Sequence, residues 1–340
     1  MPSLPKHRLF QRSDRIAEGW YWALPSSALR KGQVRPLRIQ GKALAVFRGA
    51  DGKVVALDAY CPHLGAHLGH GQVEGNGLRC GLHRWKFDAD GRCVDVPCQQ
   101  RAAAVATGNH PVEERFGLIW VYTGPIPRRP PPFIPELQNE DVVTTSGTLF
   151  RLRCHPHALL AHAVDAQALH VAGRLAPEEE FTVRSLDEGC QLFTAAPPPK
   201  RYSLCAWNGA TFTLSFGPEA RRLHLLFATR LGEGGGTEGT VLAVSKFRAG
   251  LRGRLFTWLM LLLAGVFQRA FLRRAGALLA TQRFAIKAPV RGDRALVELA
   301  QHLDRQSPSR WGYGEVEPEP IQVETTLPRS LRPVRPGLRN

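Results

Sequence analysis

Two cysteines and two histidines in two short, glycine-rich segments are the residues best suited to chemistry. The first segment supplies Cys61 and His63, and the second supplies Cys80 and His83. Thiolates and imidazoles both bind iron, and a two-iron cluster can have two thiolates on one iron and two imidazoles on the other. Each segment contributes one ligand of each kind. The spacing therefore predicts two loops that meet at one [2Fe–2S] cluster.

A structural zinc site is the alternative for the same four residues. Zinc-binding pairs usually have about two to four residues between their ligands, whereas only Pro62 separates Cys61 from His63. The spacing favours a Rieske-type cluster, and nearby glycines would let the loops approach it: Gly65, Gly69, Gly71 and Gly81. Because imidazoles replace two thiolates, such a cluster has a reduction potential between about −150 and +300 mV.

The elements around the two segments predict a small all-β domain. Short strands and tight turns follow one another over residues 20–122. They include a strand over 35–48 that ends at the hairpin signal Asp51-Gly52, and a buried strand over 117–122. The Pro-rich stretch that comes next cannot sustain a helix or a strand ladder, so we expect a stiff linker there.

The second half of the chain predicts helices packed on an antiparallel sheet. Helices are expected over 155–172 and 255–279, with strands between them over 181–184, 191–195, 211–216, 223–229 and 240–247. The fold class is therefore α+β, with an all-β cluster domain first. The predicted division is an arm over 1–17, the cluster domain over 18–124, a linker over 125–136, the second domain over 137–310 and a Pro/Arg-rich tail over 311–340.

Composition limits the cellular setting and the partners. The chain has 340 residues, a net charge of +16 and seven scattered cysteines, and it begins without the apolar stretch of a secretory signal. We therefore expect a cytoplasmic protein. The positive charge predicts an acidic electron donor or an anionic membrane surface as partner, and no nucleic-acid motif is recognisable. Four basic residues beside the cluster segments would either dock the donor or form a solvated rim: Arg79, Arg84, Lys86 and Arg92.

The apolar stretch over 255–267 is too short to cross a bilayer, which needs about 20 residues. We expect a buried core helix or a subunit interface there. Arginines flank the stretch on both sides, however, as they do in helices that lie in a membrane interface. Peripheral contact with the inner face of a membrane is the alternative.

The sequence resembles the large (α) subunit of Rieske non-haem iron oxygenases, the family of ring-hydroxylating dioxygenases, 3-ketosteroid hydroxylases and cholesterol-desaturase-like enzymes. The likeness lies in Gly19-Trp20-Tyr21, in the loops CPHLGAHLGHG and CGLHRW, and in FDADGRCVDVP and GLIW. It implies a Rieske domain before a helix-grip catalytic domain, usually in a homo- or hetero-trimer. A ferredoxin or flavin reductase would supply electrons, which pass from the cluster of one subunit to a mononuclear iron in the next.

The chain departs from the family pattern at the mononuclear iron. The family supplies a D-x-x-H-x-x-x-x-H helix, in which the acid links the cluster of the neighbouring subunit to an iron ligand. Asp165 matches that acid, but Ala168 and Gly173 stand at the two histidine positions. Gln282 stands where the family has its carboxylate ligand. Arg84 is a further departure, since most members have glycine after the second cluster histidine.

A different ligand set could replace the missing one. Asp165 and His170, together with His162 or His157, could bind an iron if the helix were kinked. The main hypothesis is an electron-transfer subunit that is non-catalytic or depends on an active α-subunit-like partner. The alternative is an active monooxygenase that uses this atypical site on a hydrophobic substrate. A purely structural metal module is a third hypothesis.

Overall fold

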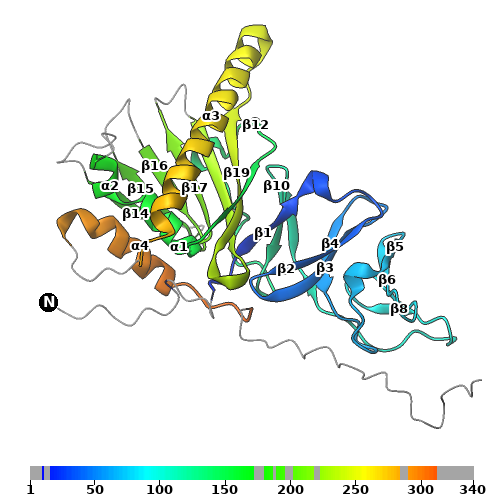
Figure 1. The fold of residues 1–340 in the computed structure, drawn as a ribbon. Coiled ribbons are helices and arrows are strands. Elements are labelled where there is room, and N and C mark those ends of the chain that lie inside the picture. The colour runs from blue at the N-terminus through cyan, green and yellow to red at the C-terminus, as the bar shows by residue number, and fades with distance from the viewer. Residues whose placement is uncertain are drawn as a thin grey trace, which may run out of the picture.

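The computed structural model describes residues 10, 16–171, 180–186, 189–195, 202–217, 223–283 and 290–311. Most of the expected arm over 1–17 and of the expected tail over 311–340 lies outside these residues. Figure 1 shows a β-rich part formed by residues 16–122 beside a larger part in which helices cover a sheet. The expected α+β fold class, with an all-β domain in front of a helix-covered antiparallel sheet, is confirmed.

Three small antiparallel sheets make up the first domain. One has the strand order β1-β11-β10, and its strands are Trp20–Pro25 (β1), Val112–Arg115 (β10) and Leu118–Tyr122 (β11). The second has the order β2-β3-β4-β9: Val34–Ile39, Lys42–Arg48, Val54–Asp58 and Asn109–His110. The third has the order β5-β6-β7-β8: Gln72–Glu74, Gly77–Arg79, Lys86–Phe87 and Cys93–Asp95. The expected buried strand over 117–122 is β11, whose five residues are all buried.

The expected single strand over 35–48 is wrong, because this stretch is a hairpin of its own. β2 and β3 pair in antiparallel register and are joined at Gln40-Gly41. Both of these residues have positive φ, at 52° and 82°, as a two-residue type I′ turn requires. The Asp51-Gly52 turn then joins β3 to β4.

The second domain is built on an eight-stranded antiparallel sheet with the order β12-β19-β18-β17-β16-β15-β14, and β13 also pairs with β19. The strands are Val142–Thr144 (β12), Thr148–Leu152 (β13), Thr182–Ser185 (β14), Gln191–Ala195 (β15), Tyr202–Ala206 (β16), Thr211–Phe216 (β17), Leu223–Leu231 (β18) and Thr237–Lys246 (β19). The helices are Pro156–Ala163 (α1), Ala166–Val171 (α2), Gly250–Leu279 (α3) and Arg294–Asp304 (α4). β12, β13, β16 and α4 were not expected from the sequence.

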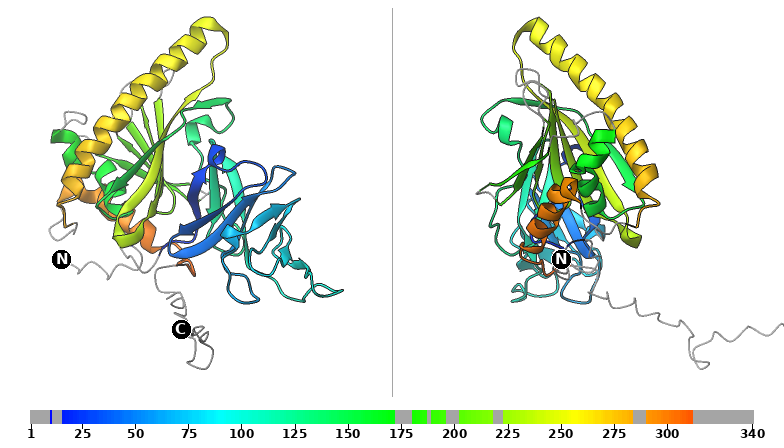
Figure 2. Two further views of the ribbon diagram at one scale, coloured as in Figure 1. Left: turned by 45° about the vertical axis from the view of Figure 1, so that its right-hand side comes forward. Right: turned by 90° about the vertical axis from the view of Figure 1, so that its left-hand side faces the viewer.

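Alternating side chains of β18 join the sheet to two different layers. Leu225 and Phe227 face a core that also contains residues of α1, α3 and α4. Leu226 and Ala228 face the opposite way, into a core with Trp20 and Trp120 of the first domain. The sheet therefore lies between the helices and the β1–β11 sheet, an arrangement visible in both views of Figure 2. This packing fixes the two domains against each other.

Candidate iron–sulfur site

The first ligand loop begins at the end of β4, where Asp58 contacts two basic side chains. Its carboxylate oxygen Oδ1 lies 2.8 Å from His110 Nε2 and 3.2 Å from Lys42 Nζ. Burial acts to raise the pKa of Asp58, but His110 and Lys42 outweigh it and lower the pKa overall. A charged Asp58 thus ties strands β3, β4 and β9 together directly before the loop that carries Cys61.

The two ligand loops have the same backbone pattern. In the first, Cys61 N donates to Ala66 O and Gly65 N donates to Cys61 O, both at 2.9 Å. In the second, Cys80 N donates to Trp85 O at 2.8 Å and Arg84 N donates to Cys80 O at 3.2 Å. Each cysteine therefore begins a turn, which is closed by backbone hydrogen bonds to the residues four and five positions later.

The matched backbone pattern of the two loops gives a physical reason for the glycine that the family resemblance predicts at position 84. Gly65 and Arg84 occupy equivalent places in the two loops, and both have positive φ, at 73° and 63°. A side chain in this left-handed conformation costs about 1–2 kcal/mol. Arg84 adopts this conformation nevertheless, and its Nη1 donates to Gln72 Oε1 at 3.2 Å.

The structure brings the four predicted ligands together as two pairs. Cys61 and Cys80 are buried and lie close enough for their thiols to interact. His63 and His83 are exposed, with ring centroids 4.7 Å apart. His63 also stacks on Trp85 at 4.3 Å, which orients its ring. An inner thiolate pair and an outer imidazole pair fit the two irons of a Rieske cluster, whereas a single zinc ion would need all four groups around one point.

Hydrogen-bond donors in the first loop favour the same group. Burial raises the pKa of the Cys61 thiol, and the backbone amides of His63 and Leu64 act against that rise by donating to its sulfur. Amides that point at a ligand sulfur stabilise its anionic, metal-bound form and tune the cluster potential. The donor set and its surroundings thus fit a [2Fe–2S] cluster.

Residues 19–111 match the family model described as the Rieske [2Fe-2S] domain. This part of the chain is a Rieske domain. Aminopyrrolnitrin oxygenase PrnD of Pseudomonas fluorescens is 33% identical over 142 residues, which cover 39% of this chain and 38% of that protein. The probable 3-ketosteroid-9-alpha-monooxygenase oxygenase component of Rhodococcus rhodochrous is 36% identical over 119 residues, or 35% of this chain and 30% of that protein. The aligned segments thus span less than two-fifths of either relative.

The fold similarity extends over most of the chain. The crystal structure of apo dicamba monooxygenase superposes with a TM-score of 0.61 at 19% identity, covering 85% of this chain and 96% of that one. The chain therefore has a Rieske domain followed by a second domain with the fold of a Rieske oxygenase catalytic domain. Together these likenesses make it similar to the α-subunits of Rieske non-haem iron oxygenases.

The sequence left open whether the four basic residues beside the Rieske loops dock a donor or form a solvated rim, and three of them lie near carboxylates. Arg79 pairs with Glu74 at 2.5 Å and with Asp95 at 2.6 Å, and Lys86 also lies 3.4 Å from Glu74. Arg92 lies 3.8 Å from Asp90 on the surface. Acidic neighbours thus offset the charges of Arg79 and Lys86, whereas the exposed Arg84 hydrogen-bonds to the neutral Gln72. Other exposed groups of the two ligand loops are His63 and His83 with two leucines that the sequence did not single out, Leu64 and Leu82.

Arg79 has a structural task that its sequence position next to Cys80 did not reveal. Besides its two ion pairs, its Nη1 donates to the carbonyl oxygen of Arg84 at 2.7 Å. The hydrogen bond from Arg79 lowers the pKa of Glu74 to about 2, so the pair persists throughout the neutral pH range. Arg79 therefore holds the end of the second ligand loop against β5.

We expect Arg79→Gln to weaken cluster retention without removing a ligand. The variant loses both ion pairs and the contact that fixes the carbonyl of Arg84, so the second loop opens more easily. Iron loss should be several-fold faster when the protein is dialysed against a chelator. Arg92→Gln is the matched control, because the Arg92 side chain is 74% exposed and its ion pair with Asp90 is long, at 3.8 Å. Equal rates for both variants would contradict the assigned task of Arg79.

The expected helix over 155–172 is two helices, and Asp165 explains the break. α1 ends at Ala163, and α2 starts at Ala166. Asp165 Oδ1 accepts a hydrogen bond from Ala168 N at 3.0 Å, as an N-cap residue does. Asp165 thus begins α2, whatever further part it has in electron transfer.

Of the three positions matched to the mononuclear iron ligands, the structure describes Ala168 and Gln282. Ala168 is partly exposed on α2 and has no ligating atom, and Gly173 lies outside the described residues. Gln282 is exposed just after the end of α3, so it does not face the interior of the domain. The exposed position of Gln282 therefore does not show that a carboxylate ligand has been lost there. The buried amide on α3 is Gln268, which is 1% exposed.

Two histidines of the substitute ligand set, His162 and His157, have different aromatic neighbours. His162 lies beside the Phe271 ring of α3, and burial lowers its pKa. His157 is buried, and its ring stacks on the Phe10 ring with the two centroids 5.5 Å apart. Among the described residues, no three histidine, cysteine, aspartate or glutamate side chains gather as a site for one metal ion. The expected site of Asp165, His170 and His162 or His157 therefore has no support from the described residues and stays a prediction.

Proposed function

We propose that this chain is a redox component of a Rieske oxygenase system, which takes electrons from a reductase and serves the oxygenation of a hydrophobic substrate. The observation that carries the proposal is the pairing of buried Cys61 and Cys80 with exposed His63 and His83. When bound, the [2Fe–2S] cluster accepts and releases one electron at a time at a relatively high potential. The reductase, a ferredoxin or a flavoprotein, is inferred from the oxygenase components that the chain resembles.

The protein's own residues would connect the cluster to its partners. The two imidazoles reach the surface, so an electron need not cross a layer of protein to enter or leave. Leu64 is 67% exposed and Leu82 is 57% exposed, and they flank the imidazoles. Apolar groups around an exposed redox site suit a short-lived contact that excludes water. We assign partner docking to these imidazoles and leucines, beside which Arg84 is also exposed.

The geometry of the second domain supports oxygenation on a partner subunit. Its described residues gather no three ligand side chains around one metal ion. On this proposal, electrons would leave this chain for an iron held by an active α-subunit-like partner. A trimer, with equal or different subunits, remains the expected assembly. In this arrangement the chain has an oxygenase fold and an electron-carrying role.

The second candidate is an oxygenase that binds its own iron, and the comparisons favour it. The relatives named above are oxygenases, and the one from Rhodococcus rhodochrous acts, by its name, on a ketosteroid. The substrate in this case would be hydrophobic. A surface pocket lies between β13 and α3, and its α3 residues begin at Arg269. The apolar stretch over 255–267 would therefore not line this pocket.

Counting iron separates the two candidates. We expect two irons and two inorganic sulfides per isolated chain after anaerobic reconstitution, together with a Rieske EPR signal on reduction. A third iron that is lost in Asp165→Ala would establish the second candidate. Asp165→Asn is the matched control, because asparagine still caps α2 but is no longer a carboxylate. Zinc without an EPR signal would exclude both candidates.

A further inference from the structure

Helix α3 has an apolar face that the rest of the described chain leaves uncovered. It is 30 residues long and contacts β13, β18, β19 and α1. It contacts them through one buried stripe: Thr257, Ala264, Gln268, Leu272, Ala275 and Leu279. A second stripe of large apolar side chains is exposed: Leu251, Leu255, Trp258, Leu259, Leu262, Leu263 and Val266. The expectation of a buried core helix is therefore wrong for this half of α3.

The two stripes lie on nearly opposite sides of the helix. At about 100° per residue, the exposed stripe covers about 140° of the circumference, centred roughly opposite the buried one. It extends about 22 Å along the axis. Figure 1 and Figure 2 show the first turns of α3 (yellow) rising beyond the sheet. The exposed stripe is thus too large and too continuous to be scattered surface hydrophobicity.

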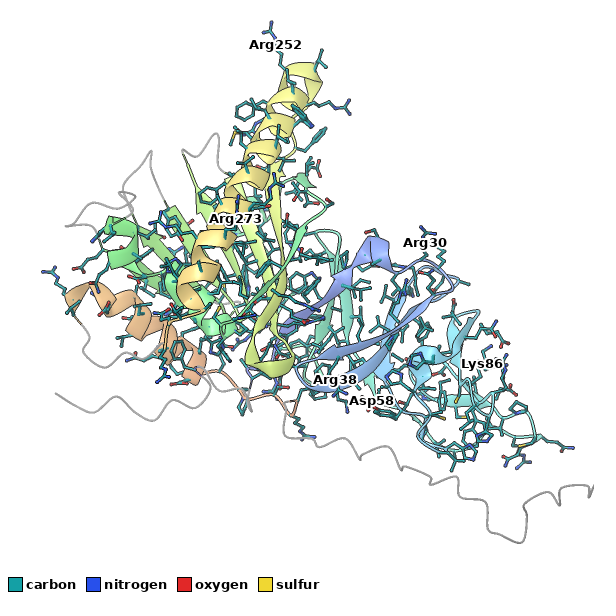
Figure 3. All side chains as sticks on the ribbon, in the orientation of Figure 1. Arg30, Arg38, Asp58, Lys86, Arg252 and Arg273 are labelled. Carbon is teal, nitrogen blue, oxygen red and sulfur yellow. The ribbon has the colours of Figure 1, made fainter. Side chains whose placement is uncertain are left out.

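Arginines bound the apolar stripe at both ends, and α3 contains no acidic residue. Arg252 and Arg254 lie in its first turns, and Arg269 and Arg273 lie beyond Val266. Figure 3 shows Arg252 at the projecting end and Arg273 where the helix packs on the domain. Apolar side chains between basic ones, with a tryptophan among them, are typical of helices in the headgroup region of an anionic bilayer.

A basic pocket adjoins the second group of arginines. It measures about 610 Å³ between β13 and α3 and is lined by Arg151, Arg153, Arg269 and Arg273 with apolar groups such as Leu272. Arg151 pairs with Glu238 at 3.2 Å. The other three make no ion pair with any described residue. Such a pocket has the charge to receive a phosphate headgroup.

We propose that α3 and this basic pocket dock the chain on an anionic phospholipid bilayer, with the helix lying in the membrane interface. α3 is long and apolar enough to cross a bilayer by length and composition alone. Its buried stripe holds it on the sheet, however, so insertion across the membrane would strip the domain of its cover. The Rieske loops lie at the far end of the molecule, where a reductase can reach them (Figure 1).

The α3 helix of a second copy, packed antiparallel about a two-fold axis, is a poorer occupant of the same face. A two-fold contact places the same surface patch on both partners. Two antiparallel α3 helices would bring Arg252 and Arg254 of one copy toward Arg269 and Arg273 of the other, with no acidic residue of α3 between them. Anionic lipid headgroups complement these charges, whereas a second α3 repels them.

Vesicle sedimentation tests the proposal on the full chain. We expect binding to vesicles that contain phosphatidylglycerol and at least tenfold weaker binding to pure phosphatidylcholine. Leu255→Glu/Leu262→Glu and Arg269→Ser/Arg273→Ser should each weaken binding to the anionic vesicles at least tenfold. Leu278→Glu is the matched control, since Leu278 is 54% exposed on α3 but lies outside the stripe. A thermal melt and the iron content show whether each variant is folded.

Four outcomes would contradict the proposal. The wild-type chain could fail to sediment with anionic vesicles, or Leu278→Glu could weaken binding as much as the stripe variants. The stripe variants could instead convert an oligomer to monomers in analytical ultracentrifugation while vesicle binding is unchanged, which would identify the face as a contact between copies. Tight binding that is equal on both vesicle types would also contradict a role for the arginines.

Discussion

Cys80→Ser is expected to remove the Rieske EPR signal and to reduce the iron content from two per chain to nearly none. Cys80 is buried beside Cys61, and a serine hydroxyl is a poor substitute for a thiolate on iron. Without the cluster, the paired loops also lose the group that they enclose, so the thermal unfolding midpoint should fall. Iron analysis, EPR of the reduced protein and a thermal melt measure the three effects.

Cys98→Ser is the control for this prediction. Cys98 lies near the Rieske loops in sequence but is an exposed free cysteine. Its replacement should leave the iron content, the EPR signal and the melting temperature unchanged. If Cys98→Ser lost the cluster and Cys80→Ser kept it, the ligand assignment would be refuted.

His63→Cys/His83→Cys is expected to lower the reduction potential of the cluster by at least about 250 mV. Two anionic thiolates would replace two neutral imidazoles, which disfavours the reduced and more negative state. Clusters of the Rieske type range from about −150 to +300 mV, whereas plant-type clusters with four thiolates lie near −400 mV. A potentiometric titration followed by EPR measures the change.

His70→Cys separates ligand exchange from the mere addition of a thiol to the first loop. His70 is exposed in the same loop, but its ring lies beside His67, which accepts a hydrogen bond from Gly69 N. The potential of this variant should stay within the Rieske range. An unchanged potential in the double histidine variant would show that His63 and His83 do not hold iron.

The cluster ligands could be predicted from the sequence because the chemistry is local. Cys61 and His63, like Cys80 and His83, lie within a few residues of each other, so residue type and spacing nearly define the site. The fold class followed for a similar reason, since strand and helix patterns are properties of short segments. Hairpin β2–β3 was missed because Gln40-Gly41 is a weaker turn signal than the Asp51-Gly52 pair beyond it.

The remaining features depend on contacts between distant residues. Arg79 is basic in the sequence, but Glu74 and Asp95 neutralise it only because β5, β6 and β8 come together. From the sequence, Asp165 was expected to lie on an electron path. In the structure it accepts a hydrogen bond from Ala168 N and caps α2, which divides the expected helix in two. The apolar stretch over 255–267 contained no information on which of its two faces the sheet would cover.

Iron-edge anomalous diffraction on crystals of the reconstituted protein is the most direct test of the central claim. We predict two iron peaks at the Rieske loops, one beside the sulfurs of Cys61 and Cys80 and the other beside the imidazoles of His63 and His83. No iron peak is expected beside Asp165. A single zinc peak among the four ligands, or a third iron peak at Asp165, would contradict this account.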